Sequence, residues 1–246
     1  IFTSYGNKTT PHHKTNPGLH HLAFSAGTHE EIDEFHRKVV SFYESHVDHG
    51  QILDVPALYP QYGPHYYAVI FTDPDGVKLG LAFSSKSVVP LPTYVCSTTS
   101  ELSPSSDMNY TGTINHISLS CSGMIKGRAF YHFLLADLMG YNEGREDSYG
   151  TNYTRKTAEM IFISPGNTTP HHKSNPGLHH LALSVGIHEE TDEFHTRIVG
   201  FYASHANHGH ILDAPALYPE YGPHDYAVFF TDPDGVKLEL VFSKGQ

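Results

Sequence analysis

Cationic residues, cysteines and long apolar runs are all scarce in this sequence. Its 246 residues hold 15 Lys and Arg against 26 Asp and Glu, so the chain lacks the basic face that a nucleic-acid partner requires. No apolar run approaches the roughly 20 residues of a membrane-spanning helix. The two cysteines, Cys96 and Cys121, have no metal-type spacing and are interpreted as isolated thiols. With 39% hydrophobic and 17% charged residues, the chain is predicted to be globular.

The most informative feature present is an internal duplication. Residues Thr9 to Ser84, the first copy, return as Thr168 to Ser243, the second copy, at a constant offset and with about three quarters of the positions identical. The few differences therefore act as an internal mutation series. One of them is Gly80, which stands where the second copy has Glu239.

Each copy carries the pattern of five secondary-structure elements. In the second copy, a helix is predicted by apolar residues at helical spacing, and a hairpin is predicted by the Asp-Pro-Asp-Gly turn between two strand-like runs. The order is β-α-β-β-β: Leu178–Val185, His188–Asn207, His210–Asp213, Tyr226–Thr231 and Val236–Phe242.

A middle segment, Ile114 to Ser164, is predicted to form the same module with little sequence identity. Its strand, helix and last strand are expected at residues 115–121, 126–139 and 159–164. The Ser-, Thr- and Pro-rich stretch before it has no periodicity and is typical of a linker.

Pairs of modules are expected to assemble. Residues 1–4 match residues 161–164, the end of the middle segment, so the first copy is interpreted as the second half of a repeat unit whose first half is absent from this sequence. We therefore predict a partial unit over residues 1–84, a linker over 85–113 and a complete two-module domain over 114–246. The unpaired first module is expected to cover its open sheet edge by homo-oligomerisation.

These motifs resemble the vicinal oxygen chelate superfamily, which includes glyoxalase I, bleomycin-resistance proteins and type I extradiol dioxygenases. The resemblance is carried by INHISLS (114–120) followed by AFYHFLL (129–135), and by GLHHLALS (177–184) followed by FFTDPDGVKLELVF (229–242). It implies an α+β fold in which tandem modules pair into cup-shaped mixed sheets. It also implies a divalent metal held inside the cup by residues on the first and last strands of each module.

Carried over position by position, the resemblance implies the metal ligands His116, His180 and Glu239. The fourth family position falls on Phe162. Two histidines and one carboxylate suit Fe(II), with Mn, Ni and Zn as alternatives. The competing interpretation is of structural histidines in a chain with 21 of them, and of a surface Glu239 paired with Lys237.

The extradiol signature is only partly present. The resemblance assigns the role of the catalytic histidine to His224, although its spacing from the downstream part of the signature is shorter than usual. Phe229 occupies the position of the catalytic tyrosine, which leaves Tyr226 nearby as the candidate. Phe162 and Phe229 are expected to line the substrate pocket.

The function first predicted is therefore a metal-dependent enzyme acting on a small, oxygen-chelating substrate by extradiol-like dioxygenase chemistry. The alternatives are a glyoxalase- or isomerase-type lyase, a non-catalytic binding protein of the bleomycin-resistance kind, and a secreted structural protein. Four N-x-S/T sequons motivate secretion, whereas the family resemblance implies a cytoplasmic protein. The sequons lie at Asn7, Asn109, Asn152 and Asn167.

Overall fold

The computed structural model describes residues 12–84, 113–147, 150–155, 159–172 and 174–243. These residues form three β-α-β-β-β modules, which confirms the predicted α+β fold. In the first module, the elements are β1 (Gly18–Ser25), α1 (His29–Ser45), β2 (Ile52–Leu58), the 3-10 turn η1 (Pro60–Tyr62), β3 (Tyr67–Thr72) and β4 (Lys78–Phe83).

The other two modules repeat this order. The middle module contains β5 (Ile114–Cys121), α2 (Met124–Tyr131), η2 (His132–Leu138), β6 (Asn142–Asp147), β7 (Gly150–Arg155) and β8 (Glu159–Pro165). The third module contains β9 (Leu181–Ser184), α3 (His188–Ser204), β10 (Ile211–Leu217), β11 (Tyr226–Thr231) and β12 (Lys237–Phe242). The helix predicted over 126–139 is split, because α2 continues as the π-helical η2.

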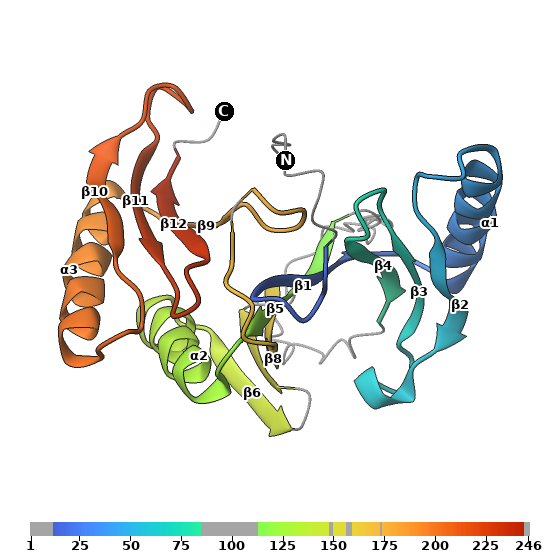
Figure 1. Cartoon of the computed structure of the whole chain (residues 1–246), viewed down its shortest axis with the longest axis horizontal. Coiled ribbons are helices and arrows are strands. Elements are labelled where there is room, and N and C mark those ends of the chain that lie inside the picture. Colours follow the sequence, from blue (N-terminus) through green and yellow to red (C-terminus); the bar gives the residue numbers. More distant parts are fainter. Residues whose placement is uncertain (1–11, 85–112, 148–149, 156–158, 173, 244–246) are drawn as a thin grey trace, which may run out of the picture.

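The modules pair differently from the prediction. The first and middle modules share one eight-stranded sheet in the order β2-β3-β4-β1-β5-β8-β7-β6, in which β1 and β5 are antiparallel. The third module forms a separate sheet, β10-β11-β12-β9. Figure 1 shows the first and third modules at opposite ends with the middle module between them. The first-strand edge left unpaired among the described residues is therefore that of β9 in the third module, and not that of the first module. The middle and third modules, residues 114–246, do not share one sheet as the predicted two-module domain requires. The two copies offer nearly the same edge strand, so their sequences do not decide which one pairs.

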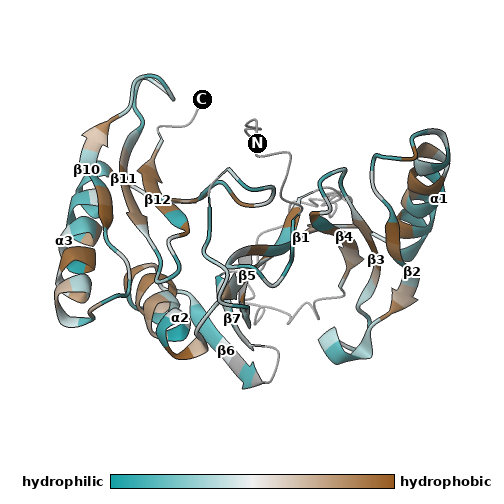
Figure 2. Cartoon of the chain, viewed as in Figure 1, coloured by the Kyte–Doolittle hydropathy of each residue, from teal (hydrophilic) through white to brown (hydrophobic). Residues whose placement is uncertain are grey.

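The middle module nevertheless contacts the third module through its helix. The ring of Phe133 stacks on that of Phe201 in α3 at 4.4 Å between centroids, and Phe130 meets Phe201 edge-on at 6.0 Å. The guanidinium of Arg197 donates a hydrogen bond to the Asp137 carbonyl at 3.1 Å. One continuous hydrophobic core joins α2 and η2 to α3, β11 and β12, visible as facing brown segments in Figure 2.

The remaining predictions concern individual residues. Cys121 is a buried free thiol, whereas Cys96 and the sequons at Asn7 and Asn109 lie outside the described residues. The Asn167 amide, a sequon nitrogen, donates hydrogen bonds to Thr15 and Asn16. None of the helices in the described part of the chain is long and apolar enough to cross a membrane.

Candidate functional site

Glu239 and His180 lie together on the third module. Glu239 is in the middle of β12, where it pairs with Ala182 of the parallel strand β9, and His180 immediately precedes β9. The His180 Nε2 atom is 3.4 Å from the Glu239 Oε2 atom. Glu239 is only 8% exposed, which excludes the alternative of a surface carboxylate. A buried carboxylate requires a partner, and His180 is one.

Lys237 is not the partner of Glu239. Its ammonium lies 3.9 Å from the centroid of the Phe229 ring, a cation–π contact. Phe229 is directly opposite Glu239 in the β11–β12 ladder, so the two side chains and Lys237 share one face of the sheet. The Tyr218 ring meets Phe229 edge-on at 5.0 Å. Burial and nearby carboxylates, including Glu239, raise the pKa of Tyr218, so its hydroxyl remains a hydrogen-bond donor at alkaline as well as neutral pH.

His116 lies elsewhere, on the eight-stranded sheet. Its Nε2 atom is 2.6 Å from the Nε2 atom of His21, so the structure pairs His116 with the histidine of the first module and does not bring it to His180. This is the direct consequence of the β1–β5 pairing. The predicted three-ligand set is therefore divided between two sheets.

His21 and His116 form a neutral pair within a series of hydrogen bonds. Burial lowers the pKa of His116 to about 4 and, together with the nearby His116, lowers the pKa of His21 to about 2. The Asn115 amide donates to Ser25 at 3.2 Å, which leaves its oxygen to accept from His116 Nδ1 at 2.9 Å. The Nε2 atom of His116 then accepts from His21.

The first module lacks the carboxylate of this pattern. Gly80 takes the place of Glu239, and a Cβ added there would meet the Ala23 Cβ at 3.5 Å, an ordinary contact. The backbone at this buried position therefore tolerates a Cβ. Phe162, the remaining family position, pairs with Ser118 in the β5–β8 ladder, but its side chain lies outside the described residues.

The two predicted catalytic residues do not face Glu239. Tyr226 lies three residues from Phe229 in β11, and its side chain is on the opposite face. Its hydroxyl donates to the Asp192 carboxylate of α3 at 2.8 Å, so the structure does not bring Tyr226 to Glu239. His224 is exposed in the connection between β10 and β11. Tyr218 lies in the loop between β10 and β11, and the sequence does not fix where that loop lies relative to Glu239.

A second cluster contains Cys121, Asp232 and Asp234, whose ligand atoms all lie within 4.8 Å of one another. Its carboxylates are already engaged. Asp232 accepts from the backbone of Asp234 and Val236 at 2.9 Å and from the Tyr131 hydroxyl at 2.9 Å. Burial raises the pKa of Asp232 to about 7. This cluster fixes the β11–β12 turn against the middle module.

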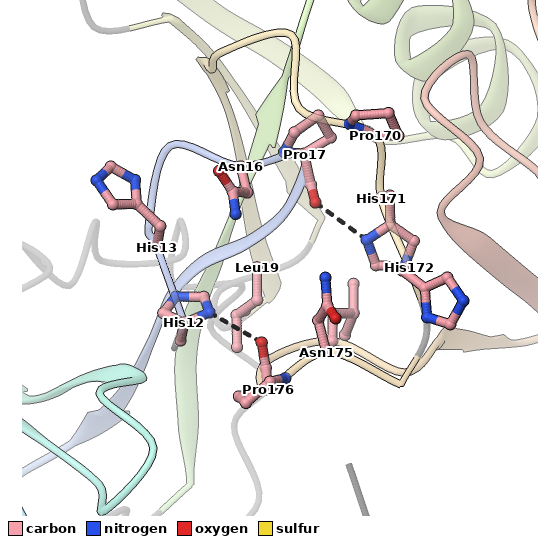
Figure 3. A pocket seen from close by; sticks show the side chains of 11 residues that line it. His12, His13, Asn16, Pro17, Leu19, Pro170, His171, His172, Asn175 and Pro176 are labelled. Carbon is pink, nitrogen blue, oxygen red and sulfur yellow. Dashed lines mark hydrogen bonds between the residues drawn. The ribbon is translucent and has the colours of Figure 1, made fainter. Parts of the chain in front are cut away.

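A small pocket lies between the duplicated Pro-His-His-Lys loops (Figure 3). The His12 Nδ1 atom is 3.1 Å from the Pro176 carbonyl, and the equivalent His171 Nδ1 atom is 3.0 Å from the Pro17 carbonyl. Because each copy holds the other by the same contact, the loops form a reciprocal clasp between the first and third modules. The clasp gives these loops a structural role.

No protein-family model matches the chain. The uncharacterized protein YqjT of Bacillus subtilis is 26% identical over 133 residues, which cover 52% of this chain and 97% of that protein. Among solved structures, a putative dioxygenase from Bacillus subtilis matches with a TM-score of 0.61 and 13% identity, covering 94% of this chain and 64% of that one. Glyoxalase I from Zea mays matches with a TM-score of 0.54 and 19% identity, covering 93% and 68%. These likenesses establish the architecture of the modules.

Proposed function

This chain has the vicinal oxygen chelate fold, and from that premise we propose that it is a metal-dependent protein acting on a small molecule with two adjacent oxygen atoms. The metal centre is on the third module, with His180 and Glu239 as its ligands. The observation that carries the proposal is the 3.4 Å approach of the His180 imidazole to the buried Glu239 carboxylate.

The donor set fits a divalent cation. Imidazole nitrogen with carboxylate oxygen suits Fe, Mn, Ni and Zn, and a site with few protein ligands leaves positions for a chelating substrate. Among the described residues, the His180 imidazole is the only basic group within ion-pair distance of the Glu239 carboxylate. A bound cation would supply Lewis-acid polarisation of a substrate oxygen. Fe(II) is our first choice, which favours dioxygenase-like chemistry, and Ni or Zn would favour a glyoxalase- or isomerase-type reaction.

Three neighbouring side chains are assigned to the substrate. Lys237 and Phe229 lie on the same sheet face as Glu239, so the ammonium is placed to attract an anionic oxygen and the ring to cover an apolar part. Tyr218, which contacts Phe229, replaces Tyr226 as the candidate hydroxyl donor. Its raised pKa keeps the proton available for a hydrogen bond to substrate.

The His21–His116 pair is assigned a lower metal affinity. The two Nε2 atoms share one proton in the neutral pair, and Gly80 supplies no carboxylate to offset the charge of a cation. Binding a divalent ion there requires that the hydrogen bond between the rings is lost.

Metal titration of the chelator-treated chain tests the proposal. We expect about one tightly bound divalent ion per chain, by elemental analysis after gel filtration. Glu239→Gln should abolish it, because an amide does not neutralise the cation, while His21→Asn should retain it. Lys237→Ala should keep the metal and weaken binding of a catecholate or hydroxyketone probe.

Two results would contradict the proposal. One is a Glu239→Gln variant that binds metal as the original chain does. The other is the absence of stoichiometric metal after reconstitution, together with binding of the same probes, which would favour the non-catalytic binding protein.

A further inference from the structure

The two copies end their helices with the same pair of histidines. α1 is followed by His46-Val47-Asp48-His49 and α3 by His205-Ala206-Asn207-His208. In each segment the first histidine is the C-cap of the helix, and the second lies in the loop that leads to the next strand. Figure 1 shows the two helices at opposite ends of the described chain, so these helix-end pairs are separate from each other. The function proposed above uses neither of them.

The rings of the two helix-end pairs have nearly the same arrangement. The centroids of His46 and His49 are 5.1 Å apart with 76° between the ring planes, and those of His205 and His208 are 5.3 Å apart with 72°. With a metal–nitrogen distance of about 2.1 Å, a ring centroid lies about 3.2 Å from the ion, so two imidazoles on one tetrahedral ion have centroids about 5 Å apart. Both pairs have this separation.

Backbone carbonyls fix the tautomer of these rings. His46 and His205 each donate from Nδ1 to the carbonyl of the phenylalanine four residues earlier, at 3.0 Å. His208 donates from Nδ1 to the Ala206 carbonyl at the same distance. Because a carbonyl only accepts, the proton is on Nδ1 and the Nε2 atom keeps its lone pair, which is the form in which a histidine binds a metal.

Other close histidine rings in the described chain use their nitrogen atoms differently. His21 and His116 share a hydrogen bond between their Nε2 atoms, and His179 and His180 share one between their Nδ1 atoms. Within the described residues, no such bond joins the two rings of either helix-end pair, which meet edge-on. The nitrogen atoms that face outward in these pairs therefore remain available to a ligand.

A phenylalanine holds both rings of each helix-end pair in place. Phe42 stacks on His46 at 4.3 Å and meets His49 edge-on at 5.7 Å between centroids. Phe201 makes the same two contacts with the second pair, at 4.2 and 5.9 Å. Rings that are already positioned lose little rotamer freedom when they bind an ion. The carbonyl groups at the end of a helix also carry partial negative charge, which favours a cation there.

We propose that each helix-end pair binds one divalent transition ion of the Ni²⁺, Cu²⁺ and Zn²⁺ class, with its two imidazoles as the protein ligands. Imidazole nitrogen suits these ions. Water completes the coordination, since the pairs lie at the surface or are half-buried. The ion joins the end of the helix to the loop that follows, so its role is structural. Two neutral imidazoles hold an ion more weakly than a set that includes a carboxylate, such as His180 with Glu239.

The test is equilibrium dialysis of the chain against Ni²⁺, with the bound metal counted per chain by elemental analysis. We expect His49→Gln and His208→Gln each to lose about one ion, and the double variant to lose about two. The matched controls are His36→Gln and His195→Gln, which replace single histidines of the same two helices and should lose none. Because only differences between chains are compared, the result does not depend on whether Glu239 holds a metal.

A second comparison shows whether two rings hold one ion. His46→Gln should remove the same ion as His49→Gln, so the variant that lacks both histidines should lose no more than either alone. Ni²⁺ should also slow hydrogen exchange at the His49 amide, which donates to the His46 carbonyl at 3.0 Å. The proposal is wrong if the two losses add, because each histidine then binds metal independently. It is also wrong if His36→Gln loses as much metal as His49→Gln, because binding then follows only the number of histidines.

Discussion

The matched phenylalanines Phe201 and Phe42 give the sharpest test of how the modules are arranged. Phe201→Ala removes a buried ring that stacks on Phe133 and meets Phe130 edge-on, and it should cost about 3–5 kcal/mol of unfolding free energy. Phe42→Ala removes a ring that is 45% exposed and contacts mainly its own helix. It should cost about 1 kcal/mol, in proportion to the smaller apolar area that it buries.

The assay is urea-induced and thermal unfolding of the two variants in parallel, each followed by circular dichroism. At this chain length, 1 kcal/mol corresponds to a change of about 2–4 °C in melting temperature. Phe201→Ala should therefore lower the melting temperature by about 6 °C or more, and Phe42→Ala by a few degrees. Equal losses at the two positions would refute the reasoning, because they would show that the middle module does not cover α3 in preference to α1.

Three further predictions concern the turns and the first module. Asp232 has a pKa raised by burial to about 7, so the folded state holds its proton longer than the unfolded state does, and stability should fall as the pH rises from about 4 to 7 by about 1 kcal/mol per unit. Asp232→Asn should flatten this part of the profile in urea titrations, and Asp73→Asn, at the half-buried equivalent, should do so less; an unchanged slope would contradict the burial. Gly209→Ala should destabilise the chain strongly, because its φ is +125° and a Cβ would lie 2.1 Å from the Thr231 carbonyl; an unaffected melting temperature would show that this loop is arranged otherwise. Gly80→Glu places a Cβ at ordinary contact distance from Ala23 and should raise the Ni²⁺ affinity of the first module in equilibrium dialysis, with the melting temperature measured alongside; no gain in a folded variant would show that the His21–His116 pair does not open to metal.

Local structure followed closely from the sequence. The β-α-β-β-β order was readable because helical and strand periodicities alternate and an Asp-Pro-Asp-Gly turn marks each hairpin. The placement of Glu239 and Lys237 on one strand face also followed from the two-residue period of a strand. The same period puts Tyr226, three residues from Phe229, on the opposite face, where its hydroxyl donates to Asp192.

The sequence did not predict which modules pair. Both copies present nearly the same edge strand to β5, so hydrogen bonding between strands is equally favourable for either, and the choice depends on contacts made far from that edge. In the structure, Phe130 and Phe133 pack on α3 and the Tyr131 hydroxyl reaches Asp232. The middle module therefore packs its helix on the third module and pairs its strand β5 with the first module.

By itself, the sequence determined three modules of one kind and their internal strand order, and it predicted candidate metal ligands. Only the tertiary structure decided which of those residues meet, placing His116 with His21 and His180 with Glu239. The physical reason is that a repeated sequence encodes the same local structure twice. Its copies become different only through the neighbours that each one packs against.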